Sequence, residues 1–186
     1  MTTLMTNDAD NSVLVVIDIQ QRLMAAMPEA CRHSVLTEVA VLTQAAMSLA
    51  IPTLVTEQYP KGLGATEACI AEHIAKSKPI EKTCFSCAGV DEFISVLRAS
   101  KRRNVILTGV EAHICVLQTA LDLHQQGYQV FVVEDAISSR NLQHKNNAIH
   151  RLRQAGVIIT NVESVLFEWL GDAVHPEFKT ISKLLI

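Results

Sequence analysis

Short apolar runs that alternate with helical patterns constrain the fold of this chain more than any other feature of its sequence. The runs occupy residues 13–19, 53–56, 105–110, 128–133 and 157–160, with a weaker one at 79–83. Continuous apolar runs of this length are typical of strands that are buried on both faces of a parallel sheet. The sequence therefore predicts an α/β protein with a three-layer, doubly wound, mostly parallel six-stranded sheet and helices on both faces.

The stretches between these runs have the apolar spacing of helices. Helices are predicted at residues 34–50, 66–76, 90–100, 112–126, 162–170 and 176–185. A further helix ends at Gly156, with Ser138 or Ser139 as its N-cap. Residues 58–64 are rich in proline and glycine, which predicts a loop.

Length and composition bound the class of protein. At 186 residues we expect a single domain over 1–186, with the polar residues 1–11 as a flexible tail. Hydrophobic residues make up 49% of the chain, but no apolar stretch reaches the ~20 residues of a membrane span. This apolar content favours a buried sheet together with a homo-oligomer interface.

Charge and cysteine content limit the expected binding partners and the expected cellular compartment. The net charge is −3 and no basic cluster stands out, so we expect no nucleic-acid partner and no membrane partner. The N-terminus is polar and acidic, unlike a signal or transit peptide. Five cysteines fit reduced thiols better than a disulfide framework, so a cytoplasmic location is predicted.

Cys115 occupies the most informative position in the sequence. It lies in the first turn of the predicted helix that follows the strand at 105–110 and the glycine turn at Gly109. A thiol there faces unpaired backbone N–H groups and the positive end of a helix dipole, and both favour thiolate. We therefore predict that Cys115 is a catalytic nucleophile.

Two charged residues end other predicted strands at the same edge. Asp18 closes the first strand and Lys82 the third. In a sheet of order 3-2-1-4-5-6 the first and fourth strands are neighbours at the topological switch point, so Asp18 and Cys115 flank one crevice. A carboxylate can take the thiol proton, an ammonium stabilises the anions, and backbone amides can form an oxyanion hole. This combination indicates acyl transfer.

Each of these residues also has a non-catalytic interpretation. Cys115 can be a small buried hydrophobe, and Asp18 can cap the following turn. Lys82 can be solvated, with Lys76 or Lys78 taking its place in the site.

Other cysteine and histidine residues carry weaker signals. Cys84 and Cys87 form a C-x-x-C without a second pair, so they are interpreted as loop residues near the pocket mouth. His113 is interpreted as a surface or interface residue of the turn. His144 and His150 are six residues apart, a spacing that does not share a helix face, so they are not expected to form a metal pair.

Three separated motifs resemble those of the isochorismatase-like cysteine hydrolases. They are VVIDIQ at residues 15–20, EKTCFS at 81–86 and GVEAHICVLQTA at 109–120. TEQYPKGLG at 56–64 makes the chain most similar to the isochorismatase domain-containing subgroup. The resemblance covers roughly residues 13–160 and implies the sheet order 3-2-1-4-5-6.

The resemblance also implies roles for individual residues. The family's catalytic triad corresponds to Asp18, Lys82 and Cys115. Its cis non-proline peptide corresponds to the bond between Val110 and Glu111, and its oxyanion donors correspond to the backbone amides of Glu111 and Cys115.

The sequence departs from one branch of that family. Nicotinamidases carry a metal-binding Asp-x-His after the second strand, whereas residues 57–60 here are EQYP and the next histidine is His73. A metal site and a cofactor are therefore not expected. The presence of Cys115 argues against the vinyl-ether hydrolysis of true isochorismatases, which lack this cysteine.

These observations predict a metal-independent cysteine hydrolase that cleaves an amide-type C–N bond of a small molecule through a thioester. Gln20, Tyr59 and Phe85 are predicted to line the substrate pocket. Two alternatives stay open: vinyl-ether hydrolysis without a covalent intermediate, and a non-catalytic scaffold or binding protein that retains the fold.

Overall fold

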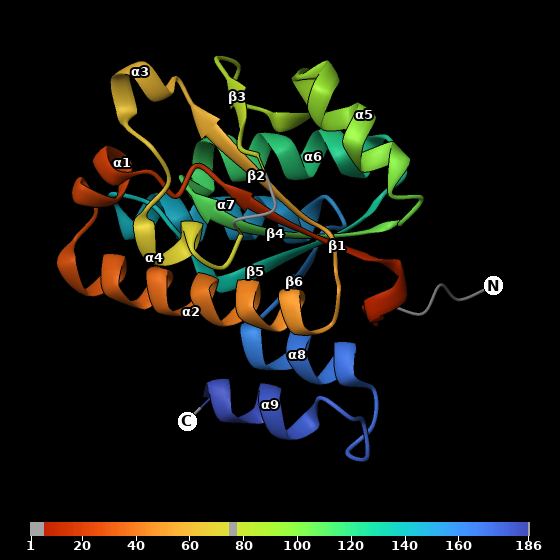
Figure 1. Cartoon of the computed structure of the whole chain (residues 1–186). Helices are drawn as coiled ribbons and strands as arrows, with labels where there is room; N and C mark the ends of the chain where they lie inside the picture. The colour runs from red at the N-terminus through yellow and green to blue at the C-terminus, as the bar shows by residue number, and fades with distance from the viewer. Residues whose placement is uncertain (1–5, 75–77, 186) are drawn as a thin grey trace.

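A six-stranded sheet in the order β3-β2-β1-β4-β5-β6 forms the centre of the computed structural model, which describes residues 6–74 and 78–185 (Figure 1). The strands are β1 (Ser12–Ile17), β2 (Thr53–Gln58), β3 (Ile80–Lys82), β4 (Asn104–Val110), β5 (Gln129–Ser138) and β6 (Ile158–Thr160). Each neighbouring pair is parallel. The predicted α/β class and sheet order are confirmed.

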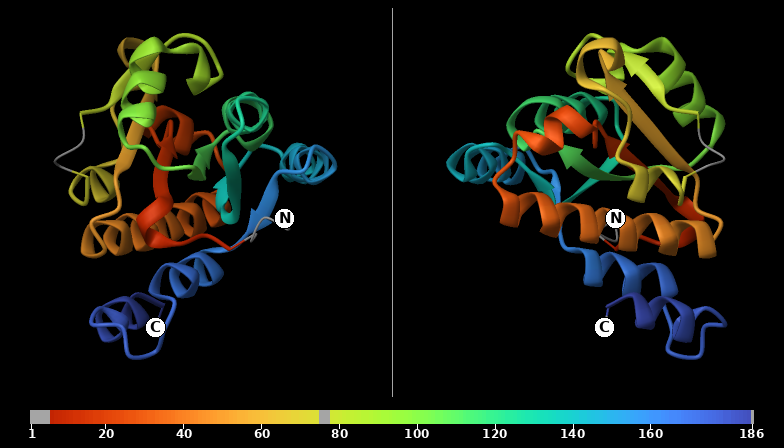
Figure 2. Two further views of the ribbon diagram at one scale, coloured as in Figure 1. Left: turned by 90° about the vertical axis from the view of Figure 1, so that its right-hand side faces the viewer. Right: turned by 60° about the vertical axis from the view of Figure 1, so that its left-hand side comes forward.

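Helices cover both faces of this sheet (Figures 1 and 2). They are α1 (Gln21–Ala25), α2 (Glu29–Ser48), α3 (Pro60–Leu63), α4 (Ala68–Ala71), α5 (Asp91–Ala99), α6 (Leu117–Gln125), α7 (Leu142–Gln154), α8 (Val162–Leu170) and α9 (Phe178–Ser182). One apolar cluster joins the sheet to α2, α4, α8 and α9. The other joins it to α5, α6 and α7. No helix in the described part of the chain is long and apolar enough to cross a membrane.

The central strand β1 explains the continuous apolar run in the sequence. Successive side chains of a strand point to opposite faces, so Leu14 and Val16 enter one cluster while Val13, Val15 and Ile17 enter the other. All five are fully buried. Because β1 has a core on each side, neither of its faces is polar. The candidate active site lies at its carboxyl end.

Several predicted boundaries were wrong. Strand β5 continues to Ser138, which pairs with Val110, so the N-cap of α7 is Asn141 instead of Ser138 or Ser139. The segment predicted as a loop at 58–64 contains the single turn α3. The predicted helix at 66–76 is reduced to α4, with residues 75–77 outside the described residues.

Residues 6–11 of the predicted flexible tail are packed against the body. Asn7 is fully buried, and its side-chain oxygen accepts hydrogen bonds from Ser12 Oγ at 2.5 Å and Trp169 Nε1 at 3.0 Å. Residues 1–5 lie outside the described residues.

Gly109 allows β4 to approach β1 closely next to the site. Its φ is +115°, and a Cβ atom added there would lie 2.0 Å from the carbonyl oxygen of Ile17. The register between β4 and β5 shifts at the same point, between Leu107 and Gly109. A side chain at this position would push apart the two strands that carry Asp18 and Cys115.

We expect Gly109→Ala to lower the free energy of unfolding by more than about 4 kcal/mol, because backbone strain and a clash with backbone atoms add together. The matched control is Gly127→Ala, whose φ is +87° with nothing within 4 Å of the added Cβ. That change should cost only about 1–2 kcal/mol. Urea unfolding of both variants checks this, and similar losses for the two would contradict it.

Candidate active site

Asp18 lies directly after β1, with a left-handed φ of 52° and a fully buried side chain. Its two carboxylate oxygens accept hydrogen bonds from different elements. Oδ2 accepts from Lys82 Nζ at 2.7 Å, and Oδ1 accepts from Thr56 Oγ1 at 2.7 Å. The carboxylate is therefore fixed by groups at the carboxyl ends of β2 and β3.

Lys82, the last residue of β3, contacts both Asp18 and Cys115. Its side chain is fully buried, and Nζ donates to Asp18, to Gln58 Oε1 at 2.6 Å and to the carbonyl oxygen of Phe85 at 3.2 Å. Nζ also lies 3.5 Å from Cys115 Sγ. Burial lowers the pKa of Lys82, but the negative charge of Asp18 opposes it, and Cys87 and Cys115 add to this effect when they ionise. The pKa of Lys82 is therefore raised, and the amine stays protonated.

Cys115 lies in a π-helical turn, Ala112–Val116, that follows β4 and leads into α6. Only 6% of the residue is exposed. The backbone N–H groups of Ile114 and Val116 both donate to the carbonyl oxygen of Glu111, which holds the turn in this wide form. Wide turns of this kind are frequent at functional sites.

The resting protonation state of Cys115 differs from the expectation. Burial raises the pKa of the Cys115 thiol to about 12, and the negative charge of Asp18 acts in the same direction while Lys82 opposes it. The prediction that this position favours the thiolate was therefore wrong for the free protein. The positive charge of Lys82 is largely neutralised by Asp18, so the sulfur keeps its proton.

The predicted pocket residues have different surroundings. Gln20 is fully buried, and its amide is bonded to Gln58 N and to the carbonyl oxygens of Gln58 and Gly64, so it tethers the 58–64 segment. Tyr59 is 54% exposed and borders a cavity of about 330 Å³ that also touches Lys82. Phe85 is 53% exposed, and its carbonyl oxygen faces Lys82 Nζ.

Two residues of β2 were missed by sequence reasoning. Thr56 is fully buried and donates to Asp18, while Gln58 accepts from Lys82 and donates to the carbonyl oxygen of Thr83. Both orient a charged group of the site. The available signal was a run of polar side chains at the end of an otherwise buried strand.

Glu111 is held from the side of β5. The Val110–Glu111 peptide bond is cis. The Glu111 carboxylate is 6% exposed and accepts from the Arg140 backbone N–H at 2.9 Å and from Arg140 Nε at 3.1 Å. Arg140 therefore anchors the residue whose amide is an expected oxyanion donor.

Of the other cysteine residues, Cys87 lies next to the site, with its Sγ 3.8 Å from Thr56 Oγ1. Cys87 is fully buried, and burial raises the pKa of its thiol to about 11, whereas Cys84 is exposed. His113 Nδ1 lies 2.9 Å from Ser139 Oγ, and its ring centroid lies 4.7 Å from that of His144. Burial lowers the pKa of His113, which favours the neutral ring.

Glu57 is engaged in the segment where the nicotinamidases carry metal ligands. Its Oε1 accepts from both the N–H and the hydroxyl of Thr66, each at 2.7 Å. Within residues 6–74 and 78–185, no group of three or more His, Cys, Asp or Glu side chains is placed to hold a metal ion.

Comparison with known proteins identifies the family of this chain. The family model for the isochorismatase domain matches residues 12–164. The chain belongs to the isochorismatase family. It is 38% identical to isochorismatase domain-containing protein 2 of Bos taurus, with 94% of this chain and 83% of the relative covered. Membership of this family supports a hydrolase.

Two further relatives span most of the chain. A secreted isochorismatase effector, Isc1, of Phytophthora sojae is 39% identical, with 94% of this chain and 84% of the relative covered. The structure described as the MAR1 ribonuclease of Caenorhabditis elegans is 39% identical, with a TM-score of 0.91, and the match covers 97% of this chain and 92% of that one.

The raised pKa of Cys115 in this isochorismatase-family chain predicts a distinctive alkylation profile. At pH 8 the Cys115 thiol is almost entirely protonated, so the rate with iodoacetamide should still rise with pH beyond pH 9. Asp18→Asn removes a charge that raises the pKa and should accelerate alkylation. Lys82→Met removes the opposing charge and should slow it.

Mass spectrometry of each cysteine checks these rates, with the exposed Cys84 as an internal reference for the reagent. A rate at Cys115 that is already constant by pH 7, or equal effects of the two substitutions, would contradict the assignment.

Proposed function

We propose that this chain is a metal-independent cysteine hydrolase that cleaves an amide-type C–N bond of a small molecule through a thioester on Cys115. The observation that carries the proposal is the continuous buried array of Asp18, Lys82 and Cys115. Lys82 Nζ lies 2.7 Å from Asp18 Oδ2 and 3.5 Å from Cys115 Sγ. A general base, a cation and a nucleophile within hydrogen-bonding reach are the parts that acyl transfer requires.

The first half-reaction forms the thioester. Asp18 takes the Cys115 proton as the sulfur attacks the substrate carbonyl, and the backbone amides of Glu111 and Cys115 stabilise the oxyanion. The protonated Asp18 then gives this proton to the leaving nitrogen, and the C–N bond breaks. The high resting pKa of Cys115 fits a thiol that is deprotonated only when it reacts.

The second half-reaction releases the acid. Asp18 removes a proton from water, the resulting hydroxide attacks the thioester, and the C–S bond breaks. The proton returns to sulfur, so the net reaction adds one water across the C–N bond. Lys82 keeps its proton throughout, because its raised pKa suits a fixed positive charge better than a proton donor.

The cost of the buried charges supports a catalytic role over a scaffold that merely retains the fold. Removing a carboxylate and an ammonium from water costs of the order of several kcal/mol per ion. A pair of apolar side chains of similar volume often stabilises the fold at least as much as a buried ion pair. Asp18 and Lys82 are nevertheless both fully buried beside the thiol. A scaffold gains nothing from this arrangement, whereas a hydrolase needs it.

The expectations for assembly and location stay predictions. The high apolar content of the chain, 49%, is the observation behind the expected homo-oligomer. A cytoplasmic location also stays a prediction, and one relative is described as a secreted effector.

The test is a screen of small primary and secondary amides, followed by variants of the site. Cys115→Ala, Asp18→Asn and Lys82→Ala should each lower kcat/KM by at least about 10³-fold, because the three groups act as a unit. Cys69→Ser removes an exposed thiol on α4 and serves as the matched control with unchanged activity.

The intermediate gives a second readout. Rapid quenching with the best substrate should add the acyl mass to the peptide that contains Cys115. Full activity of Cys115→Ala would contradict the proposal and support hydrolysis without a covalent intermediate.

A further inference from the structure

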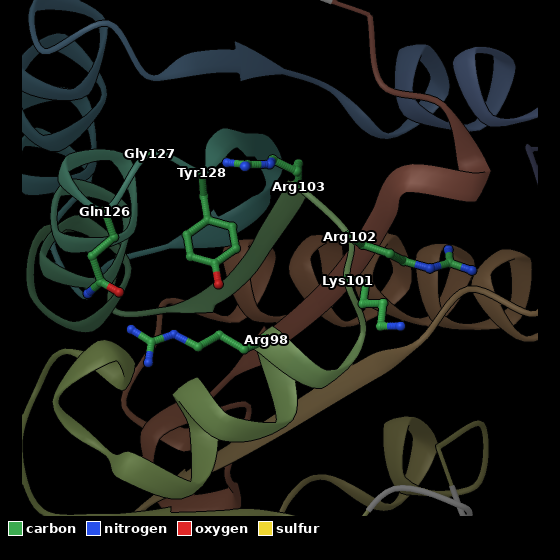
Figure 3. A pocket seen from close by; sticks show the side chains of 7 residues that line it. All are labelled: Arg98, Lys101, Arg102, Arg103, Gln126, Gly127 and Tyr128. Carbon is green, nitrogen blue, oxygen red and sulfur yellow. The ribbon is translucent and has the colours of Figure 1, made fainter.

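A second cavity lies at the opposite edge of the sheet from Cys115. It has a volume of about 460 Å³ and forms where α5 and α6 end and β4 and β5 begin. Its lining comprises Arg98, Lys101, Arg102, Arg103, Gln126, Gly127 and Tyr128 (Figure 3). The volume falls within the range of small-molecule sites, roughly 300–1,000 Å³.

The cavity concentrates positive charge in a chain whose net charge is −3. Four of its seven lining residues are cationic, and none is acidic. Across residues 6–74 and 78–185, no carboxylate forms an ion pair with Arg98, Lys101 or Arg103. The expectation that the sequence holds no basic cluster was therefore wrong at residues 98–103. Uncompensated like charges lining one hollow raise the local concentration of anions.

The backbone beneath these charges is held rigidly. Arg102 Nη1 donates to the carbonyl oxygens of Ala9 at 2.6 Å and Ser12 at 2.9 Å, so this guanidinium is committed to the N-terminal segment. The Arg103 N–H donates to Asn11 Oδ1 at 2.9 Å. A rigid frame lowers the conformational entropy that binding has to remove.

The remaining side chains line the cavity at the two ends of Tyr128. Figure 3 shows the Arg98 guanidinium and the Gln126 amide toward the hydroxyl end of Tyr128, and the Arg103 guanidinium toward its backbone end. The side chains of Lys101 and Arg102 extend the other way in this view. Two guanidinium groups, an amide and an aromatic ring therefore line the same cavity, with one guanidinium group toward each end of the ring.

We propose that this cavity binds a phosphate-bearing small molecule of mononucleotide size. The phosphate bonds to the guanidinium group of Arg98, whose planar fork matches phosphate oxygens, and polar atoms at the other end of the ligand bond to that of Arg103. A planar ring packs against Tyr128, and the Gln126 amide bonds to its edge. The site is separate from the proposed reaction centre, so its test does not depend on the proposed hydrolase activity.

Calorimetric titration of the whole chain with ADP, inorganic phosphate and adenosine tests the proposal. We expect ADP to bind, phosphate to bind more weakly and adenosine not to bind. Arg98→Gln and Arg103→Gln should each weaken ADP binding at least about tenfold, because each removes charge-assisted hydrogen bonds. Tyr128→Leu should weaken ADP binding and leave phosphate binding unchanged.

The matched control is Arg32→Gln, which removes one exposed arginine from the first turn of α2. It should leave ADP binding unchanged, and thermal unfolding by circular dichroism verifies that each variant is folded. No binding of ADP at millimolar concentration, or an equal loss in Arg32→Gln, overturns the proposal. A single-stranded RNA oligomer that binds far more tightly than ADP also overturns it, in favour of an extended nucleic-acid surface.

Discussion

The buried ion pair between Asp18 and Lys82 is the interaction on which the site depends. It joins residues 64 positions apart at the ends of β1 and β3, two strands that are separated in the sheet by β2. On the intervening strand, Thr56 donates a hydrogen bond to Asp18, and Gln58 accepts one from Lys82. Side chains from three strands therefore form hydrogen bonds to the two charged groups. The pair is buried without leaving either charged group unpartnered.

This pairing also determines the protonation state of the Cys115 thiol. A lysine beside a cysteine lowers the pKa of the thiol when its charge is free to act. Here Asp18 neutralises that charge at 2.7 Å, and burial dominates the pKa of Cys115. The ammonium becomes available to the sulfur once Asp18 has accepted a proton, so a single proton transfer reorganises the electrostatics of all three groups.

The two edges of the sheet differ in how they hold charge. At the carboxyl edge Asp18 and Lys82 are buried and compensate each other, which suits groups that move protons. At the amino edge Arg98, Lys101 and Arg103 are exposed and unpaired within the described residues, which suits recognition of an anion from solvent. The same parallel sheet thus separates the proposed reaction centre from the proposed anion site by the length of its strands.

The sequence by itself determined the strands and placed Asp18 and Lys82 at strand ends, because apolar runs and the polar residues that end them are local signals. Its resemblance to a known family supplied the sheet order. The sequence did not determine the end of β5, since pairing of Ser138 with Val110 extends a strand beyond its apolar run. It also missed the roles of Thr56, Gln58 and Gln20, because hydrogen bonds between strands and loops depend on register. The basic run at residues 98–103 is a local signal that the sequence analysis overlooked, whereas the pKa of Cys115 was decided only by the tertiary structure. Burial and the separation of charges are properties of the packed chain, and no local pattern carries them.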